Sequence, residues 1–126
     1  MTDRYMEEIF EKFSDTETCP VRNIICRFST KWGLLVLSIL SQGGTVRFNQ
    51  FQKAMPDISP KVLTSTLKTL EADELITRKI YPTVPPKVEY SLTPIGEELV
   101  VHLTPIVKWA KEHFAEISKH RRKYTK

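Results

Sequence analysis

The sequence predicts a mainly α-helical fold with one small β-hairpin. Three observations predict it. Apolar residues recur at helical spacing through most of residues 3–73, they change to a period of two over residues 75–81 and 88–92, and helical spacing returns after Thr93 and Pro94. The resulting order is helix, short strand, helix, tight turn, helix and hairpin, which is the order of a winged helix-turn-helix with extra helices at both ends.

Length and composition indicate a single ordinary domain. The 126 residues are 40% hydrophobic and 27% charged, as in soluble domains. The apolar stretch Trp32–Leu40 is far shorter than the roughly 20 residues of a membrane helix. The first ten residues lack the basic and apolar regions of a secretion signal. We therefore expect a cytoplasmic protein without a membrane partner, whose two cysteines stay reduced.

Two helices are expected ahead of the core. The helix nearer the core should begin at Pro20, where a missing N–H costs nothing, and reach about Phe28. The helix before it, over residues 3–13, is short and amphipathic, so it needs a surface to pack against. Its apolar side chains are Tyr5, Met6, Ile9, Phe10 and Phe13.

The next helix, expected over Lys31–Ser41, is apolar around nearly its whole circumference and should lie at the centre of the core. Ser29 or Thr30 would cap it, and it closes at Gly43 and Gly44. A short strand at 45–48 and a two-turn helix at 50–55 then complete the first half of the motif.

A further helix should run from Pro60, with Ser59 as its N-cap, to about Asp73. Leu63, Leu67 and Leu70 form its inward stripe. The opposite face contains no acid, and Glu71 lies at its margin. The residues of that face are Lys61, Thr64, Ser65, Lys68 and Ala72.

Alternating residues then predict two strands, over 75–81 and 88–92, joined by a proline-bearing loop. A long helix should follow from Pro94, and Pro105 predicts a kink or two abutting helices near Thr104. Its expected inward residues are Ile95, Leu99, Leu103, Ile106, Ala110, Phe114 and Ile117.

The net charge of +4 is unevenly distributed along the chain. Residues 1–18 hold two basic and six acidic side chains, and residues 94–118 hold two and four. Residues 19–93 hold ten basic and five acidic side chains, and residues 119–126 hold five basic side chains and no acidic one. The basic middle and tail favour a polyanionic partner, with a solvated basic face as the alternative.

Double-stranded DNA is the partner that this order of elements predicts, because the second helix of a helix-turn-helix enters the major groove. The wing cations would contact the backbone beside it, although a basic hairpin also protects an edge strand. The basic tail is expected to be a frayed, non-specific electrostatic arm. The expected DNA contacts are Arg47, Lys61, Thr64, Ser65, Lys68, Arg78, Lys79 and Lys87.

Seven segments together resemble the HxlR family of bacterial winged-helix transcription regulators. The likeness covers about residues 19–117, and it implies a homodimer built from the terminal helices. Two departures stand out: Glu74 and the pair Ser29-Thr30 occupy positions where the family usually has glycine. The segments are Cys19–Val21, Lys31-Trp32, Arg47-Phe48, Ser59–Leu63, Leu67–Glu71, Pro85–Thr93 and Gly96–Trp109.

Three parts are therefore expected: a dimer-forming helix over 1–18, a winged helix-turn-helix over 19–117 and a basic tail over 118–126. The dimer should bind a palindromic operator with half-sites about one helical turn apart, with repression as the expected outcome. No enzymatic activity and no cofactor are expected, because the three histidines are dispersed and the four glycines form no phosphate loop. A winged-helix module that binds only proteins is the alternative.

Cys19 is a second candidate site. It precedes Pro20 at a helix N-terminus and lies near Arg22, so a thiolate there would be stabilised by the helix dipole and a cation. The resemblance implies a redox or electrophile sensor at this position, and a structural cysteine is the alternative. Cys26 is expected in the core. At ~10 Å along one helix the two are too far apart to bridge, so a disulfide would join subunits.

Overall fold

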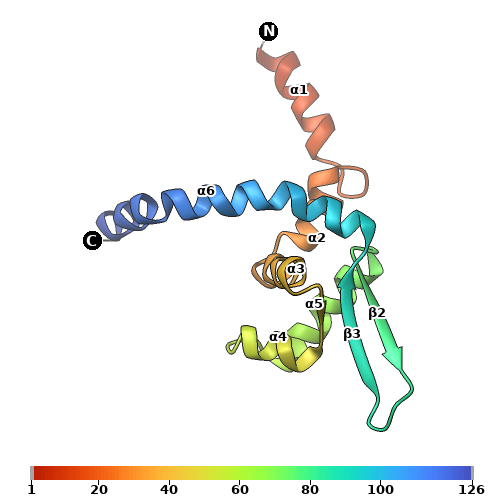
Figure 1. Ribbon diagram of the computed structural model, residues 1–126. Coiled ribbons are helices and arrows are strands. Elements are labelled where there is room, and N and C mark those ends of the chain that lie inside the picture. The colour runs from red at the N-terminus through yellow and green to blue at the C-terminus, as the bar shows by residue number, and fades with distance from the viewer. Residues whose placement is uncertain (1, 126) are drawn as a thin grey trace.

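Helix α3 (Lys31–Gly43) runs through the centre of the fold, as its apolar circumference predicts (Figure 1). Figure 1 shows a computed structural model that describes residues 2–125. Val36, Leu37 and Leu40 are buried, and the Thr30 hydroxyl caps the helix by accepting the N–H of Gly33 at 3.0 Å. The side of α3 that carries Leu35 is exposed.

The helix-turn-helix consists of α4 (Phe48–Ala54) and α5 (Pro60–Ala72). Strand β1 is only Thr45–Val46, shorter than expected, because Arg47 already caps α4. The Arg47 N–H donates to the Gln50 side-chain oxygen at 2.9 Å. Ser59 caps α5 by accepting the N–H of Val62 at 3.1 Å, which confirms the predicted start of this helix.

The wing is an antiparallel hairpin of β2 (Ile76–Tyr81) and β3 (Lys87–Leu92). Strand β1 pairs with the edge of β3 that β2 leaves free, so the sheet order is β1-β3-β2. Tyr90 faces Val46 and Arg78 across the sheet, and its ring meets Phe51 edge-on with centroids 6.0 Å apart. Burial raises the pKa of the Tyr90 phenol.

One buried cluster joins α3, α4, α5 and the base of the wing. The predicted α5 stripe is confirmed: Leu63, Leu67 and Leu70 are all buried. The cluster comprises Phe28, Val36, Leu37, Leu40, Val46, Phe51, Met55, Ile58, Leu63, Leu67, Leu70, Leu75, Ile76 and Tyr90.

The helical segment before α3 begins with one π-helical stretch, Val21–Ile25, and ends as α2 (Cys26–Phe28). The expectation that Cys26 belongs to the core is wrong, because Cys26 is exposed and Phe28 is the buried residue of α2. At the end of this segment Arg27 forms an ion pair of 2.7 Å with Asp73, just after α5.

Helix α6 (Pro94–Tyr124) is continuous, so the expected alternative of two abutting helices near Thr104 is wrong. Proline has no N–H, so Pro105 leaves the carbonyl of Val101 without its helical hydrogen bond. Both residues are exposed, so solvent can reach this carbonyl. The expected frayed tail is also corrected, because residues 118–124 continue α6 as helix.

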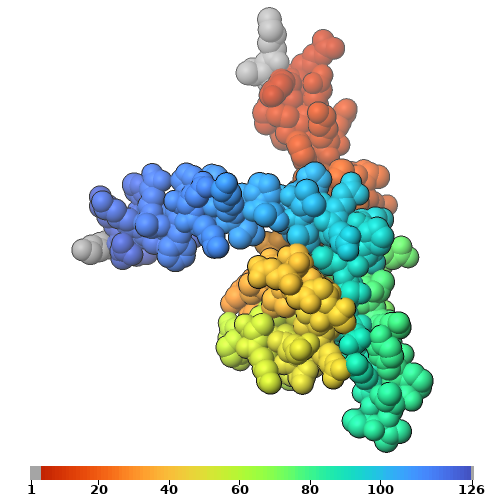
Figure 2. Space-filling view, viewed as in Figure 1, coloured from red at the N-terminus to blue at the C-terminus, as the bar shows by residue number. Residues whose placement is uncertain are grey.

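The predicted inward stripe of α6 is only partly inward. Leu99 and Leu103 pack against the core, but Ile95, Ile106 and Phe114 are 59%, 61% and 71% exposed. Figures 1 and 2 show the reason: most of α6 projects beyond the body of the fold as an arm. Helix α1 (Thr2–Phe13) projects likewise, with Phe10 and Phe13 exposed.

The turn after α5 takes the left-handed conformation at Glu74, with φ of 57°. The N–H of Leu75 donates to the Leu70 carbonyl at 3.0 Å, and the N–H of Glu74 donates to Glu71. This is the geometry that a C-terminal glycine provides, and here Glu74 adopts it without being glycine.

Within residues 2–125 no single helix is long and apolar enough to cross a membrane. In the same residues, one pair of consecutive helical segments, Val21–Phe28 and Lys31–Gly43, reaches the required length and hydropathy together, but the pair is bent by 63°. The same residues contain no group of three or more His, Cys, Asp or Glu side chains placed to hold a metal ion.

Candidate nucleic-acid interface

The exposed face of α5 is built as the sequence predicts. Lys61, Thr64, Ser65 and Lys68 are all exposed, and together with Pro60 and Thr69 they line one shallow depression without an acidic side chain. The Thr64 hydroxyl donates to the Pro60 carbonyl at 2.8 Å, so its lone pairs point outward as acceptors. Among residues 2–125, no ion pair engages Lys61 or Lys68.

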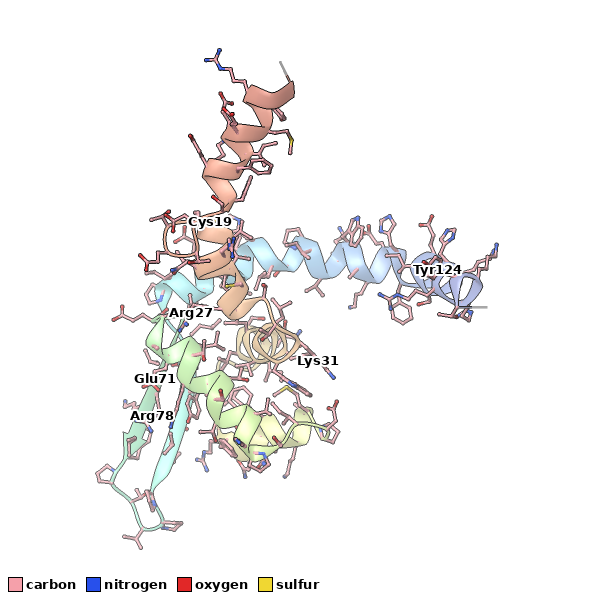
Figure 3. The ribbon with its side chains drawn as sticks, turned by 180° about the vertical axis from the view of Figure 1, so that it is seen from behind. Cys19, Arg27, Lys31, Glu71, Arg78 and Tyr124 are labelled. Carbon is pink, nitrogen blue, oxygen red and sulfur yellow. The ribbon has the colours of Figure 1, made fainter. Side chains whose placement is uncertain are left out.

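The wing cations lie on two different faces of the hairpin, because neighbouring residues of a strand alternate. Arg78 is opposite Tyr90 and lies on the side of α5, where its Nε is 3.7 Å from a carboxylate oxygen of Glu71 (Figure 3). Lys79 is opposite Glu89 and Lys87 is opposite Tyr81, on the other face.

Glu89 is the centre of this second face. Its carboxylate lies 3.9 Å from Nε of Arg47 and 3.6 Å from Nζ of Lys87, and its side chain is only 19% exposed. The Tyr81 ring lies nearby, with Nζ of Lys79 at 5.0 Å and Nζ of Lys87 at 5.2 Å from its centroid. The ring and the carboxylate therefore hold three cations close together.

The structure thus groups the eight predicted contacts in three sets. Four residues share the face of α5, Arg78 lies beside that face, and Arg47, Lys79 and Lys87 surround Glu89. Sequence reasoning placed Glu71 at the margin of the α5 face but missed its contact with Arg78, and it missed the position of Glu89 among the wing cations. Glu89 follows Lys87 by two residues on one strand, so alternation alone signals that both lie on the same side. The contact of Glu71 with Arg78 joins two elements and has no such signal.

Cys19 lies at the joint between α1 and the rest of the chain (Figure 3). Its side chain is 1% exposed and its thiol is free. Arg22, the cation expected to stabilise its thiolate, instead donates to the carbonyls of Phe13 and Ser14, each at 3.2 Å. The arginine therefore satisfies the C-terminal end of α1.

The turn between α1 and Cys19 is held by its own hydrogen bonds. The Asp15 carboxylate accepts the N–H groups of Glu17 at 2.8 Å and Thr18 at 3.3 Å, and these bonds lower the pKa of Asp15. Asn23 donates its side-chain amide to the Glu17 carbonyl at 3.0 Å. These hydrogen bonds fix the turn that leads from α1 into Cys19.

Comparison with known proteins decides the family. The family model for HxlR-like helix-turn-helix proteins matches residues 28–118. The chain belongs to the HxlR family. Among its relatives are the HTH-type transcriptional regulators YtfH of Escherichia coli and YdeP of Bacillus subtilis. YtfH is 37% identical over 101 residues, which are 80% of this chain and 79% of that protein. YdeP is 39% identical over 106 residues, 83% of this chain and 81% of that protein.

Solved structures of similar proteins have the same fold. The regulator YtfH of Salmonella typhimurium aligns with a TM-score of 0.75 at 36% identity, covering 84% of this chain and 94% of that one. The redox regulator HypR in its reduced form aligns with a TM-score of 0.74 at 33% identity, covering 79% and 98%. These matches confirm the winged helix-turn-helix, and the chain is an HxlR-type DNA-binding transcriptional regulator.

Proposed function

We propose that this HxlR-type regulator reads DNA with the exposed face of α5. The observation that carries the proposal is the acid-free surface of Lys61, Thr64, Ser65 and Lys68 on the second helix of the motif. Short hydroxyl side chains let the helix backbone approach base edges, and the two free ammonium groups neutralise phosphates. The wing adds Arg78 on the α5 side and Lys79 and Lys87 on the other.

We also propose that the protein acts as a homodimer. The exposed apolar side chains of α1 and of the outer part of α6 have no partner within residues 2–125, and a surface of this kind marks an interface. A two-fold pair would present two α5 helices to half-sites about one helical turn apart on a palindromic operator. A repressor acting by occupying such an operator is the simplest mode of action.

The DNA assignment is tested on fragments that the purified protein selects from its source genome. Affinity for the selected duplex should fall steeply with salt concentration, because bound phosphates release counterions. Lys68→Glu should weaken binding about a hundredfold or more, since each subunit loses a phosphate contact and gains a repulsive charge. Lys111→Glu, the same charge change on α6, should bind as the wild type does. Equal binding by Lys68→Glu would contradict the assignment.

The dimer is tested by sedimentation. Phe114→Glu places a charge in the exposed apolar stripe of α6 and should yield monomers, because an unpaired charge is costly inside an interface. Val101→Glu is the matched control, an apolar-to-acid change on the same helix at a side chain that is 68% exposed and lies outside the stripe, at about 340° from Pro94. A dimeric Phe114→Glu variant would show that α6 is not the interface.

Thiol regulation at Cys19 is a second candidate function, and the likeness to the redox regulator HypR supports it. The oxidised form of HypR aligns with a TM-score of 0.69 at 36% identity, covering 75% of this chain and 96% of that one. Burial of Cys19 means that an oxidant such as diamide would react only when the structure around Cys19 opens. Two Cys19 thiols from two subunits would then give a disulfide, passing two electrons and two protons to diamide. Diamide should release the operator from wild type and Cys26→Ser but not from Cys19→Ser; equal release from all three would exclude this role.

A further inference from the structure

A groove of about 290 Å³ lies between α3 and α6, in the inner angle between the arm and the body of the fold (Figure 2). Ser38, Val100 and Leu103 are half-buried at its floor, and the remaining residues form its exposed rim. The lining residues are Ser38, Ser41 and Gln42 from α3 and Val100, Leu103, Thr104, Val107, Lys108 and Lys111 from α6.

The cationic side of the groove faces away from the apolar stripe of α6. At about 100° per residue from Pro94, Leu103 falls at about 180°, and Val100, Thr104, Val107, Lys108 and Lys111 fall between about 220° and 320°. The stripe residues Ile95, Ile106, Trp109, Phe114 and Ile117 fall between about 60° and 200°. A partner subunit seated on the stripe would therefore border the groove at Leu103 and Val107 and leave Lys108 and Lys111 open to solvent.

One part of the groove lining is apolar and another part is cationic. Val100, Leu103 and Val107 form the wall. Lys108 and Lys111 are one helical turn apart, no acidic side chain lines the groove, and within residues 2–125 neither lysine takes part in an ion pair. The two ammonium groups beside the apolar wall are therefore available to pair with an anion from outside the chain.

The hydroxyl groups in the groove cannot serve as further donors, because each already donates to the backbone of its own helix. Ser38 donates to Leu34 at 2.8 Å, Ser41 to Ser38 at 2.9 Å and Thr104 to Val100 at 2.9 Å. The donors that face a ligand are therefore the two ammonium groups and the amide of Gln42, and they favour an acceptor that carries negative charge.

We propose that this groove binds an amphipathic organic anion. Its apolar body lies against Val100, Leu103 and Val107, and its carboxylate or sulfonate accepts hydrogen bonds from Lys108 and Lys111. A neutral apolar molecule would partly desolvate the two ammonium groups without compensation. A small inorganic anion would leave the apolar wall exposed to water. The site lies apart from the α5 face, so it stands independently of the DNA contacts proposed above.

The test compares two fluorescent probes that share one ring system. 8-Anilinonaphthalene-1-sulfonate carries a negative charge, and N-phenyl-1-naphthylamine is its neutral counterpart. Titrated against the wild-type protein, the sulfonate should bind about tenfold or more tightly than the neutral probe. Lys108→Gln/Lys111→Gln should weaken sulfonate binding about tenfold and leave binding of the neutral probe unchanged.

Two further variants define the location. Lys119→Gln/Lys123→Gln removes the same charge from the end of the same helix and should bind the sulfonate as the wild type does. Ser41→Trp fills the groove from an exposed position of α3 and should weaken binding of the sulfonate about tenfold. Equal affinity for the two probes, or unchanged sulfonate binding in the Lys108 and Lys111 double variant, would overturn the proposal. A protein that binds duplex DNA but not the sulfonate would refute this site alone.

Discussion

The carboxylate of Glu89 lies 3.9 Å from Nε of Arg47, so the central strand of the wing contacts the residue that caps the first helix of the helix-turn-helix. The same carboxylate lies 3.6 Å from Nζ of Lys87. An acid therefore stands among cations that we propose to contact phosphates, and it reduces their net positive potential.

Glu89→Gln should tighten binding to duplex DNA about three- to tenfold, because it removes one negative charge per subunit close to the phosphates. Stability should fall by about 1 kcal/mol or less, since partly exposed ion pairs contribute little. Affinity measured at several salt concentrations checks both the direction and the electrostatic origin. Glu112→Gln on α6 is the control and should change nothing. Weaker binding by Glu89→Gln would mean that the acid orients Arg47 and Lys87 and that its charge is the smaller effect.

Glu74→Gly should stabilise the protein by about 0.5–1 kcal/mol. Glu74 has a φ of 57°, which side chains disfavour and glycine adopts readily. The gain is smaller than the strain itself because glycine also makes the unfolded chain more flexible. Thermal unfolding of Glu74→Gly beside Ala72→Gly separates the two effects, since Ala72 is in regular helix and its replacement should destabilise. If both variants lose stability, the conformation at Glu74 carries no strain.

Gly96→Ala should destabilise the fold by about 2 kcal/mol or more. A Cβ at this position would overlap the backbone carbonyl of Leu75, and backbone cannot move aside as a side chain can. Gly43→Ala is a milder comparison, because its Cβ would meet only a methyl group of Val46, at 3.0 Å. Denaturant unfolding of both variants measures the difference. Equal stabilities would show that α6 can shift away from Leu75 at little cost.

The two thiols should react with a thiol reagent at clearly different rates. Cys26 is exposed and Cys19 is 1% exposed, so Cys26 should react about tenfold or more quickly under native conditions. Cys19→Ser and Cys26→Ser assign the two phases of the reaction. In denaturant the rates should converge. A faster Cys19 would show that the structure around it opens readily.

Much of the fold follows from the sequence because its signals are local. The spacing of Leu63, Leu67 and Leu70 defined the buried side of α5, and the same spacing left Lys61 and Lys68 outward. What could not be predicted depends on contacts between distant segments. Cys26 is exposed because Phe28 occupies the core side of α2. Phe114 is exposed because α6 outruns the body of the domain, a length mismatch that periodicity does not register.

Thr93 joins three elements at one point. Its N–H donates to Leu75 at the start of the wing, its hydroxyl donates to the Glu74 carbonyl after α5 at 2.6 Å, and the same oxygen accepts the N–H of Gly96 in α6. The 31 residues of α6 make a lever of about 47 Å that starts at this joint. A change of about 5° in the direction of α6 moves its far end by about 4 Å. In the proposed dimer, the direction in which each α6 leaves its domain therefore sets the spacing of the two α5 helices, together with the surfaces that touch.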